Sequence, residues 1–226
     1  MSPERAQLLR VWHDRAYEMQ KAKLPMHMSF MGLELHIGHE VIPPDTDNTE
    51  EGDPFHRAVE AEVRAGERVL DMGTGSGVSA LLAARRGAEV VAVDINLTAV
   101  ECAKSNAERN GLMDPITFVV GDIFEGVEGT FDLIVFDPPF RWFKPRDLLE
   151  MGTADENYRG LTKFMAEAKE RLRPGGRVIL NFGTSGDIEY LYGLIDRAGF
   201  DKEVNHYGSA SRDGMTADYY TIKLTM

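Results

Sequence analysis

The amino-acid sequence predicts an α/β fold, in which a doubly wound parallel sheet is covered by helices on both faces. Two observations carry this prediction. From residue 56 onward, short apolar segments rich in branched residues alternate with longer segments of helical periodicity. Such an alternation needs right-handed crossover connections, which place helices on both sides of a parallel sheet. The chain has 226 residues, 43% hydrophobic and 27% charged, enough for one packed core.

Residues 1–55 are expected to form an N-terminal helical segment, and residues 56–226 the core domain. Ser2 and Pro3 suit the start of an amphipathic helix over residues 2–21. From Leu24 to Phe55 the periodicity fades, which indicates either a solvated loop or part of a substrate lid. This stretch ends in an acidic run of Asp45, Asp47, Glu50, Glu51 and Asp53. Four methionines would either line the lid or anchor the helix: Met19, Met26, Met28 and Met31.

The first half of the core is predicted as three helices and three strands. Its helices lie at 56–65, 76–86 and 97–110, and its strands at 68–72, 89–94 and 116–120. Asn96 can cap the third helix and Gly111 can end it.

The second half begins with a strongly apolar strand at 131–136. A striped helix over 161–172 follows and stops at Pro174-Gly175-Gly176. A strand at 177–182, a helix at 187–198 and a closing strand pair at 200–206 and 219–224 complete the predicted core.

Charge and cysteine content exclude several classes of protein. Lys and Arg number 25 against 37 Asp and Glu, a net charge of −12, which argues against a nucleic-acid partner. A single cysteine, Cys102, excludes an internal disulfide and a cysteine-built zinc site, and it is expected to pack in a helix. His36 and His39 lack the further ligands of a metal site, so no metal is expected. No apolar segment suits a signal peptide or a membrane span, which favours a cytoplasmic location and no membrane partner.

A glycine-rich turn stands where the first core strand meets the first core helix. Asp71 precedes Gly73, Gly75 and Gly77, which are spaced by two residues. A dinucleotide site has a different glycine spacing, and a carboxylate here would repel a phosphate but suit a ligand with an ammonium group. The alternative is a turn that only packs the helix on the strand.

This turn resembles the first motif of the class I S-adenosylmethionine-dependent methyltransferases. The resemblance implies S-adenosylmethionine as cofactor and a seven-stranded Rossmann-like sheet of order 3-2-1-4-5-7-6 whose last strand is antiparallel. It also implies an acid at the end of the second strand that binds the ribose, which is Asp94, and an acid beside the adenine, which is Asp122. Asp122 could instead be an ordinary turn residue. The expected cofactor-binding residues are Asp71, Gly73, Thr74, Gly75, Gly77, Asp94, Ile95, Asp122 and Ile123.

The segment Asp137-Pro138-Pro139-Phe140 ends the fourth core strand. Asp137 and the free carbonyl of Pro138 can accept the two hydrogens of an NH₂ group, while Phe140 offers an aromatic face. We therefore expect catalytic roles for Asp137, Pro138 and Phe140. A proline turn that merely caps the strand is the alternative.

This segment resembles the proline motif of nitrogen-directed methyltransferases, and the chain resembles the release-factor glutamine methyltransferases in particular. That group has Asn where this chain has Asp137, and a longer N-terminal domain. An ionised Asp only accepts hydrogen bonds, whereas a glutamine amide also needs a donor. The sequence therefore favours methyl transfer to an amine, amino or guanidino nitrogen of a small or peptidic acceptor, with no nucleic acid. Trp142, Phe143 and Tyr158 would bind this acceptor, unless they serve the core or, like Asn157, the start of a helix.

Three alternatives stay open. The acceptor could be a glutamine side chain on a protein, with Asp137 tolerated in place of Asn. The sulfonium could serve another displacement that releases methylthioadenosine. The chain could also bind the cofactor without catalysis, although the proline motif would then have no evident use.

Overall fold

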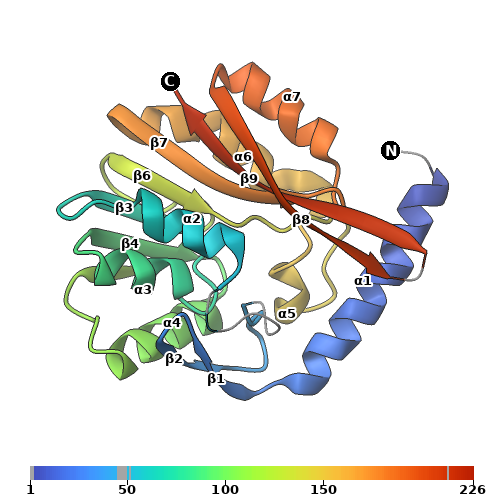
Figure 1. Cartoon of the computed structure of the whole chain (residues 1–226), viewed down its shortest axis with the longest axis horizontal. Coiled ribbons are helices and arrows are strands. Elements are labelled where there is room, and N and C mark those ends of the chain that lie inside the picture. Colours follow the sequence, from blue (N-terminus) through green and yellow to red (C-terminus); the bar gives the residue numbers. More distant parts are fainter. Residues whose placement is uncertain (1–2, 45–49, 51, 213) are drawn as a thin grey trace.

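The computed structural model describes residues 3–44, 50, 52–212 and 214–226, so most of the acidic run at 45–53 lies outside the described residues. Its main sheet has seven strands in the order β5-β4-β3-β6-β7-β9-β8 (Figure 1). The strands are β3 Arg68–Met72, β4 Glu89–Asp94, β5 Ile116–Val120, β6 Phe131–Phe136, β7 Leu172–Gly183, β8 Asp201–Arg212 and β9 Met215–Thr225. β9 pairs antiparallel with β7 and β8, and β3 to β7 are parallel. The predicted order 3-2-1-4-5-7-6 is confirmed.

Helices cover both faces of this sheet. One face carries α2 Pro54–Glu62, α3 Val78–Arg85 and α4 Leu97–Arg109, and the other carries α6 Arg159–Glu167 and α7 Ile188–Ala198. Successive residues of a strand point to opposite faces, so Val69 joins the first core and Leu70 the second. Both side chains are fully buried, as expected for a parallel sheet covered on both faces.

Helix boundaries largely follow the predicted signals. Asn96 caps α4 by accepting a hydrogen bond from the N–H of Thr98, and Asp187 caps α7 through the N–H of Tyr190. The predicted helix at 161–172 is shorter: α6 ends at Glu167, and a 3₁₀ turn over Ala168–Arg171 leads directly into β7. β7 therefore begins five residues earlier than predicted, at Leu172, and runs through the Pro-Gly-Gly sequence.

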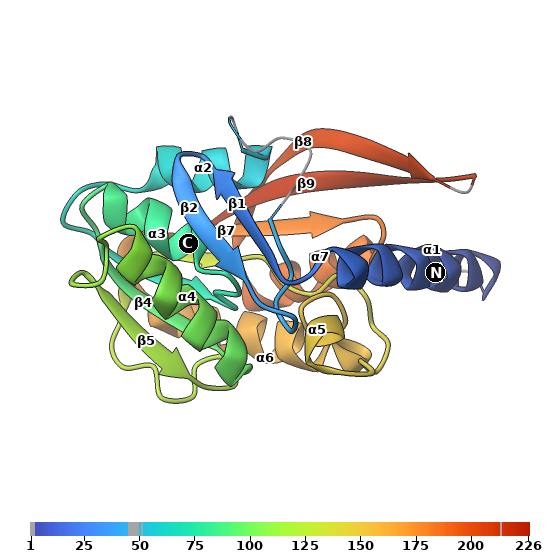
Figure 2. The same cartoon turned by 90° about the horizontal axis from the view of Figure 1, so that it is seen from below.

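The N-terminal segment contains more regular structure than predicted. The helix is present as α1 Pro3–Lys23, and the predicted loop contains an antiparallel hairpin of β1 Met26–Phe30 and β2 Leu33–Ile37. Of the two predictions for residues 24–55, a solvated loop or part of a substrate lid, the loop is therefore wrong over residues 26–37. The hairpin lies beside α4 (Figure 2), where His36 and Asn106 join the two elements: the N–H of His36 donates to Asn106 Oδ1 at 2.8 Å.

α1 lies under the far end of the β8–β9 hairpin, which extends beyond the rest of the sheet (Figure 1). Leu9 and Trp12 pack there against Met215 and Ala217. On its other side, α1 meets α5 Leu148–Met151 through His13, whose Nε2 lies 2.7 Å from Glu150. No helix in the described part of the chain is long and apolar enough to cross a membrane.

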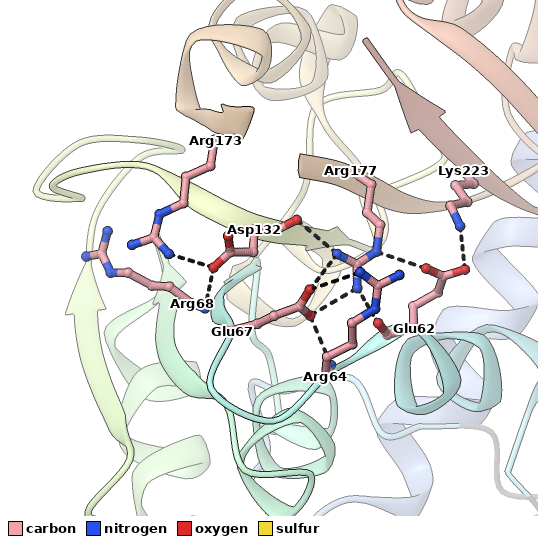
Figure 3. A network of polar contacts seen from close by, with 8 residues as sticks. All are labelled: Glu62, Arg64, Glu67, Arg68, Asp132, Arg173, Arg177 and Lys223. Carbon is pink, nitrogen blue, oxygen red and sulfur yellow. Dashed lines mark hydrogen bonds and ion pairs between the residues drawn. The ribbon is translucent and has the colours of Figure 1, made fainter. Parts of the chain in front are cut away.

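A network of ion pairs joins the amino-terminal ends of β3 and β6 to β7 (Figure 3). Its centre is Arg177, which is only 5% exposed and bonds Glu62 at 2.9 Å and Glu67 at 3.0 Å. Asp132 accepts from the N–H of Arg68 and from Arg173, at 2.8 and 2.7 Å. The network fixes the sheet at the end opposite to the carboxyl ends of β3 and β6.

Candidate active site

A cavity of about 410 Å³ opens at the carboxyl ends of β3, β4 and β6. β3 pairs with both β4 and β6, so the cavity lies where the chain order of the sheet reverses, the usual ligand position in such folds. Residues 40–44 of the N-terminal segment form one wall, and the chain between β6 and α6 forms another.

The wall at residues 40–44 is held at two points. Glu40 accepts hydrogen bonds at the start of α4, from Asn96 Nδ2 to its carbonyl at 3.0 Å and from Thr98 Oγ1 to its carboxylate at 2.9 Å. Ile42 lies against Gly152, where an added Cβ would come within 2.7 Å of the Ile42 side chain. The N-terminal segment therefore contributes one wall of the cavity through residues 40–44. Met26, Met28 and Met31 are instead packed against the core, and Met19 is exposed.

Asp71 organises the glycine turn from inside. It is 3% exposed and accepts hydrogen bonds from Thr74 Oγ1 at 2.7 Å and from the N–H of Ala80 at 3.1 Å. Burial raises the pKa of Asp71 to about 6, and these two hydrogen bonds oppose that rise. The carboxylate thus ties the end of β3 to the first turn of α3.

Asp94 joins the end of β4 to the same turn. Its carboxylate accepts from the N–H of Gly75 at 3.0 Å and from the N–H of Asn96 at 2.9 Å, and burial raises its pKa. Both carboxylate oxygens keep further lone pairs for a ligand hydroxyl. A Cβ added to Gly75 would have the carbonyl of Gly73 as its nearest contact, at 3.9 Å, so the turn leaves open space beside Asp94.

Asp122 lies at the cavity in an ion pair that the sequence does not reveal. Arg159 lies 2.7 Å and Lys163 3.5 Å from Asp122 Oδ2, and the bond from Arg159 holds the pKa of Asp122 below its usual range. Ile123 also lines the cavity. All the predicted cofactor-binding residues except Gly77 line this cavity, and Gly77 instead packs closely against Ala103 on α4.

Asp137 lies at the end of β6, exposed to the cavity. Its Oδ1 accepts from the side-chain amide of Asn181 at 3.0 Å. The surrounding protein raises the pKa of Asp137 to about 6, because it removes bulk water from the carboxylate, while the charge of His56 and the Asn181 bond oppose this rise. Of the other residues in the proline motif, Pro139 lines the cavity and Pro138 is buried.

The aromatic residues predicted to act on the acceptor, Phe140, Trp142, Phe143 and Tyr158, lie outside the cavity lining. Phe140 packs on Phe182, with ring centroids 5.1 Å apart, and its carbonyl accepts from the hydroxyl of Tyr158 at 2.9 Å. That hydroxyl also accepts a hydrogen bond from the N–H of Asp187, so Tyr158 links the proline motif to the start of α7. Phe143 is buried under α1, where its ring lies 5.1 Å from that of His13. Trp142 is half-buried and packs edge-on against Phe143.

His56, which sequence reasoning missed, also lines the cavity. The ring Nδ1 of His56 lies 2.6 Å from Asp53 Oδ2, and the backbone N–H of His56 donates to Asp53 Oδ1 at 2.9 Å. Asp53 therefore both caps α2 and holds the imidazole in place. Burial works against a charged ring, but Asp53, Asp137 and Asp71 outweigh it and raise the pKa of His56. An Asp three residues before a His, with Pro at the first helical position, is the sequence signal for this pair.

Comparison with known proteins agrees with this geometry. Residues 56–184 match the family described as the methyltransferase small domain. The chain belongs to this family. It is 33% identical over 221 residues to a release factor glutamine methyltransferase of Rhodospirillum rubrum, a match that covers 88% of the chain and 64% of the relative. It is 29% identical over 202 residues to a ribosomal protein uL3 glutamine methyltransferase of Neisseria meningitidis, covering 83% and 66%.

Two further comparisons widen the range of relatives. A ribosomal protein L11 methyltransferase of Pelotomaculum thermopropionicum is 41% identical over 140 residues, which are 62% of the chain and 38% of the relative. The chain thus spans less than two thirds of the length of these three relatives. Among solved structures, a tRNA m1G37 methyltransferase of M. jannaschii has a TM-score of 0.63 at 18% identity, covering 89% of the chain and 56% of the other, which shows the shared fold.

The methyltransferase small domain uses S-adenosylmethionine as methyl donor, and the cavity of this chain fits it. Asp94 offers lone pairs for the ribose hydroxyls and Asp71 a buried negative charge near the turn, while Gly75 leaves the space open. Bound there, the cofactor supplies a methyl group on a positively charged sulfur. Because that group is already activated, the protein mainly has to align the acceptor nitrogen.

The expected partner, a small-molecule or peptidic amine acceptor with no nucleic acid, is contradicted by the relatives. Those above are named for ribosomal proteins and a release factor, and another, 35% identical over 116 residues, is a ribosomal RNA small subunit methyltransferase C of Chromohalobacter salexigens. Net charge misleads here, because it averages over the whole surface and does not describe the rim of the cavity.

Proposed function

We propose that the chain transfers a methyl group from S-adenosylmethionine to the side-chain amide nitrogen of a glutamine in a protein. The observation that carries this proposal is the position of Asp137, which is exposed to the cavity at the end of β6, next to the proposed cofactor site. The release factor and uL3 relatives described above, which align with more than four fifths of the chain, are named as glutamine methyltransferases, and this supports the same acceptor.

In this proposal Asp137 accepts hydrogen bonds from the amide N–H groups of the glutamine, and it takes one of these protons as the bond between nitrogen and the methyl group forms and the bond between the methyl group and sulfur breaks. Asn181 holds the Asp137 carboxylate in place through its 3.0 Å bond, so the acceptor nitrogen meets a fixed partner. Alignment of this kind can supply much of the rate enhancement without a covalent intermediate. The wall between β6 and α6, which includes Pro139, Leu148 and Met151, provides an apolar surface for the rest of the acceptor side chain.

The experiment is methyl transfer from labelled S-adenosylmethionine to purified bacterial release factor and ribosomal protein uL3, followed by peptide mass spectrometry. We expect one added methyl group on a glutamine side chain. The variant Asp137→Ala should lose turnover while its affinity for S-adenosylhomocysteine, measured by calorimetry, stays unchanged. Label only on lysine, or no label on either protein, would refute the proposal, as would full turnover in Asp137→Ala.

A further inference from the structure

The amide group of glutamine presents two N–H donors and one carbonyl acceptor. At the proposed site, Asp137 provides acceptors for the N–H groups but no donor for the carbonyl oxygen. An ionised Asp137 accepts hydrogen bonds and donates none. Asn181 cannot supply the donor through its bonded hydrogen, because that hydrogen is directed at Asp137 Oδ1. The carbonyl oxygen of a bound amide needs a donor of its own, and a buried acceptor left without one is costly.

His56 is placed to be this donor. It lies in the first turn of α2, with Nδ1 committed to Asp53 at 2.6 Å. Phe30 and Phe55 meet the imidazole edge to face, with centroids 5.3 and 5.2 Å away, and restrict its rotation. Nε2 is then the nitrogen left for a ligand, and no hydrogen bond joins it to the described residues. The ring lines the same cavity as Asp137.

The charges around the imidazole favour its protonated form. Asp53 at the cap of α2, Asp137 at the end of β6 and Asp71 on β3 all raise the pKa of His56, against the effect of burial. Nδ1–H donates to Asp53, so a neutral ring would carry no hydrogen on Nε2 and a charged ring carries one there. The donor at Nε2 therefore exists only in the charged form.

We infer that His56 is a specificity-determining residue whose Nε2–H donates to the carbonyl oxygen of the amide whose N–H groups bond to Asp137. The inference rests on the proposed function. Asp53, His56 and Asp137 together would then recognise the group that a single Asn side chain can recognise in the related enzymes. Asp53 acts through His56 and is a positioning residue.

The first test compares glutamine methylation by His56→Phe and by the unchanged protein. We expect kcat/KM to fall about 10- to 100-fold, the usual effect of losing a hydrogen bond from a charged donor. His56→Gln, which keeps a side-chain N–H donor, should recover part of this loss. His27→Phe is the matched control, since His27 is exposed on β1 and stacks on His36. Affinity for S-adenosylhomocysteine should stay the same in all three variants.

The second test is a double-mutant cycle with Asp137→Asn. An Asn side chain brings its own donor, so the contact from His56 becomes redundant. Adding His56→Phe to Asp137→Asn should therefore lower kcat/KM by less than about threefold. Purely additive losses would contradict the inference, because His56 would then act independently of the residue at 137.

The third test is the pH profile of kcat/KM. Loss of the Nε2 proton should produce a fall at alkaline pH, and Asp53→Asn should shift this fall to lower pH because it removes the charge that raises the pKa of His56. A structural role for Asp53 would lower activity without moving the profile.

The outcomes separate the two proposals. If the unchanged protein methylates no glutamine, both are overturned. If it methylates glutamine and His56→Phe does so at an equal rate, the inference alone is overturned and the proposed function stands.

Discussion

Asp94 and Gly75 are joined by a 3.0 Å hydrogen bond from the backbone N–H of Gly75 to the Asp94 carboxylate. This bond fixes the turn after β3 to the end of β4, the strand beside it. Since the same carboxylate has lone pairs left for a ligand hydroxyl, its removal should affect both the shape of the turn and the binding of the cofactor.

Replacement of Asp94 with Ala should weaken the binding of S-adenosylhomocysteine at least about tenfold, since hydrogen bonds to a charged group are worth roughly 1.5–3 kcal/mol. Isothermal calorimetry measures this loss directly. Asp196→Ala serves as the control, because the Asp196 side chain is exposed on α7 and pairs only with Lys202 in the described structure. Equal affinities in the two variants would contradict a cofactor role for Asp94.

Replacement of Asp71 with Asn should stabilise the protein and weaken cofactor binding. Burial raises the pKa of Asp71 from 3.8 to about 6, so the folded state holds its proton more tightly than the unfolded state. The charge therefore destabilises the fold increasingly as pH rises from about 4 to 6, by up to about 3 kcal/mol above that range. Asn removes this cost and keeps a side-chain oxygen for Thr74 and Ala80.

Urea unfolding at pH 5 and pH 8 tests the sign of this effect. The gain of the Asp71→Asn variant in unfolding free energy should be larger at pH 8, where the unchanged residue is ionised. A larger gain at pH 5, or a loss of stability at both values, would show that the buried carboxylate does not carry this cost.

Gly77→Ala should destabilise the fold more than Gly66→Ala. Both glycines have φ near +85°, at +89° and +81°, so both variants place a Cβ in a left-handed backbone. Only at position 77 would the new Cβ lie 2.9 Å from the Cβ of Ala103, whereas at position 66 the space is open. Overpacking of this kind costs about 1–3 kcal/mol, and thermal unfolding of the two variants measures the difference. Equal melting temperatures would mean that α3 and α4 separate at little cost.

Arg177→Met should lower the unfolding free energy by about 3 kcal/mol, because it leaves the half-buried Glu62 and Glu67 carboxylates without their shared partner. Arg173→Met, the matched control, removes a more exposed guanidinium and should cost less than about 1 kcal/mol. Denaturant titration of both variants gives the comparison. Similar small losses would indicate that water replaces the buried network as well as the exposed pair.

Sequence patterns predict the core strands well where neighbouring residues in the sequence determine the strand boundaries. β3, β4, β5 and β6 begin and end at the predicted residues, because buried parallel strands are continuous apolar runs bounded by glycines, caps and prolines. The β1–β2 hairpin has only one weak signal, the alternation of Leu33, Leu35 and Ile37, and its turn at Met31-Gly32 lacks the usual Asn-Gly or Asp-Gly signature.

The site residues can be predicted from the sequence where they stand next to a predicted strand end, and not where they depend on distant elements. Asp71 and Asp94 stand at strand ends, which the sequence pattern locates. Phe143 and His56 depend instead on tertiary packing: Phe143 is covered by α1, and His56 lines the same cavity as Asp137 only because the fold brings the start of α2 there. Nothing in the local sequence of either residue shows which distant element it will contact.

The wall at residues 40–44 makes the formation of the cavity depend on contacts between distant parts of the chain. Glu40 docks on Asn96 and Thr98, and Ile42 docks on Gly152, so the wall closes only after widely separated parts of the chain have come together. Contacts across such long sequence separations form slowly, because the entropy of closing the intervening chain is lost first.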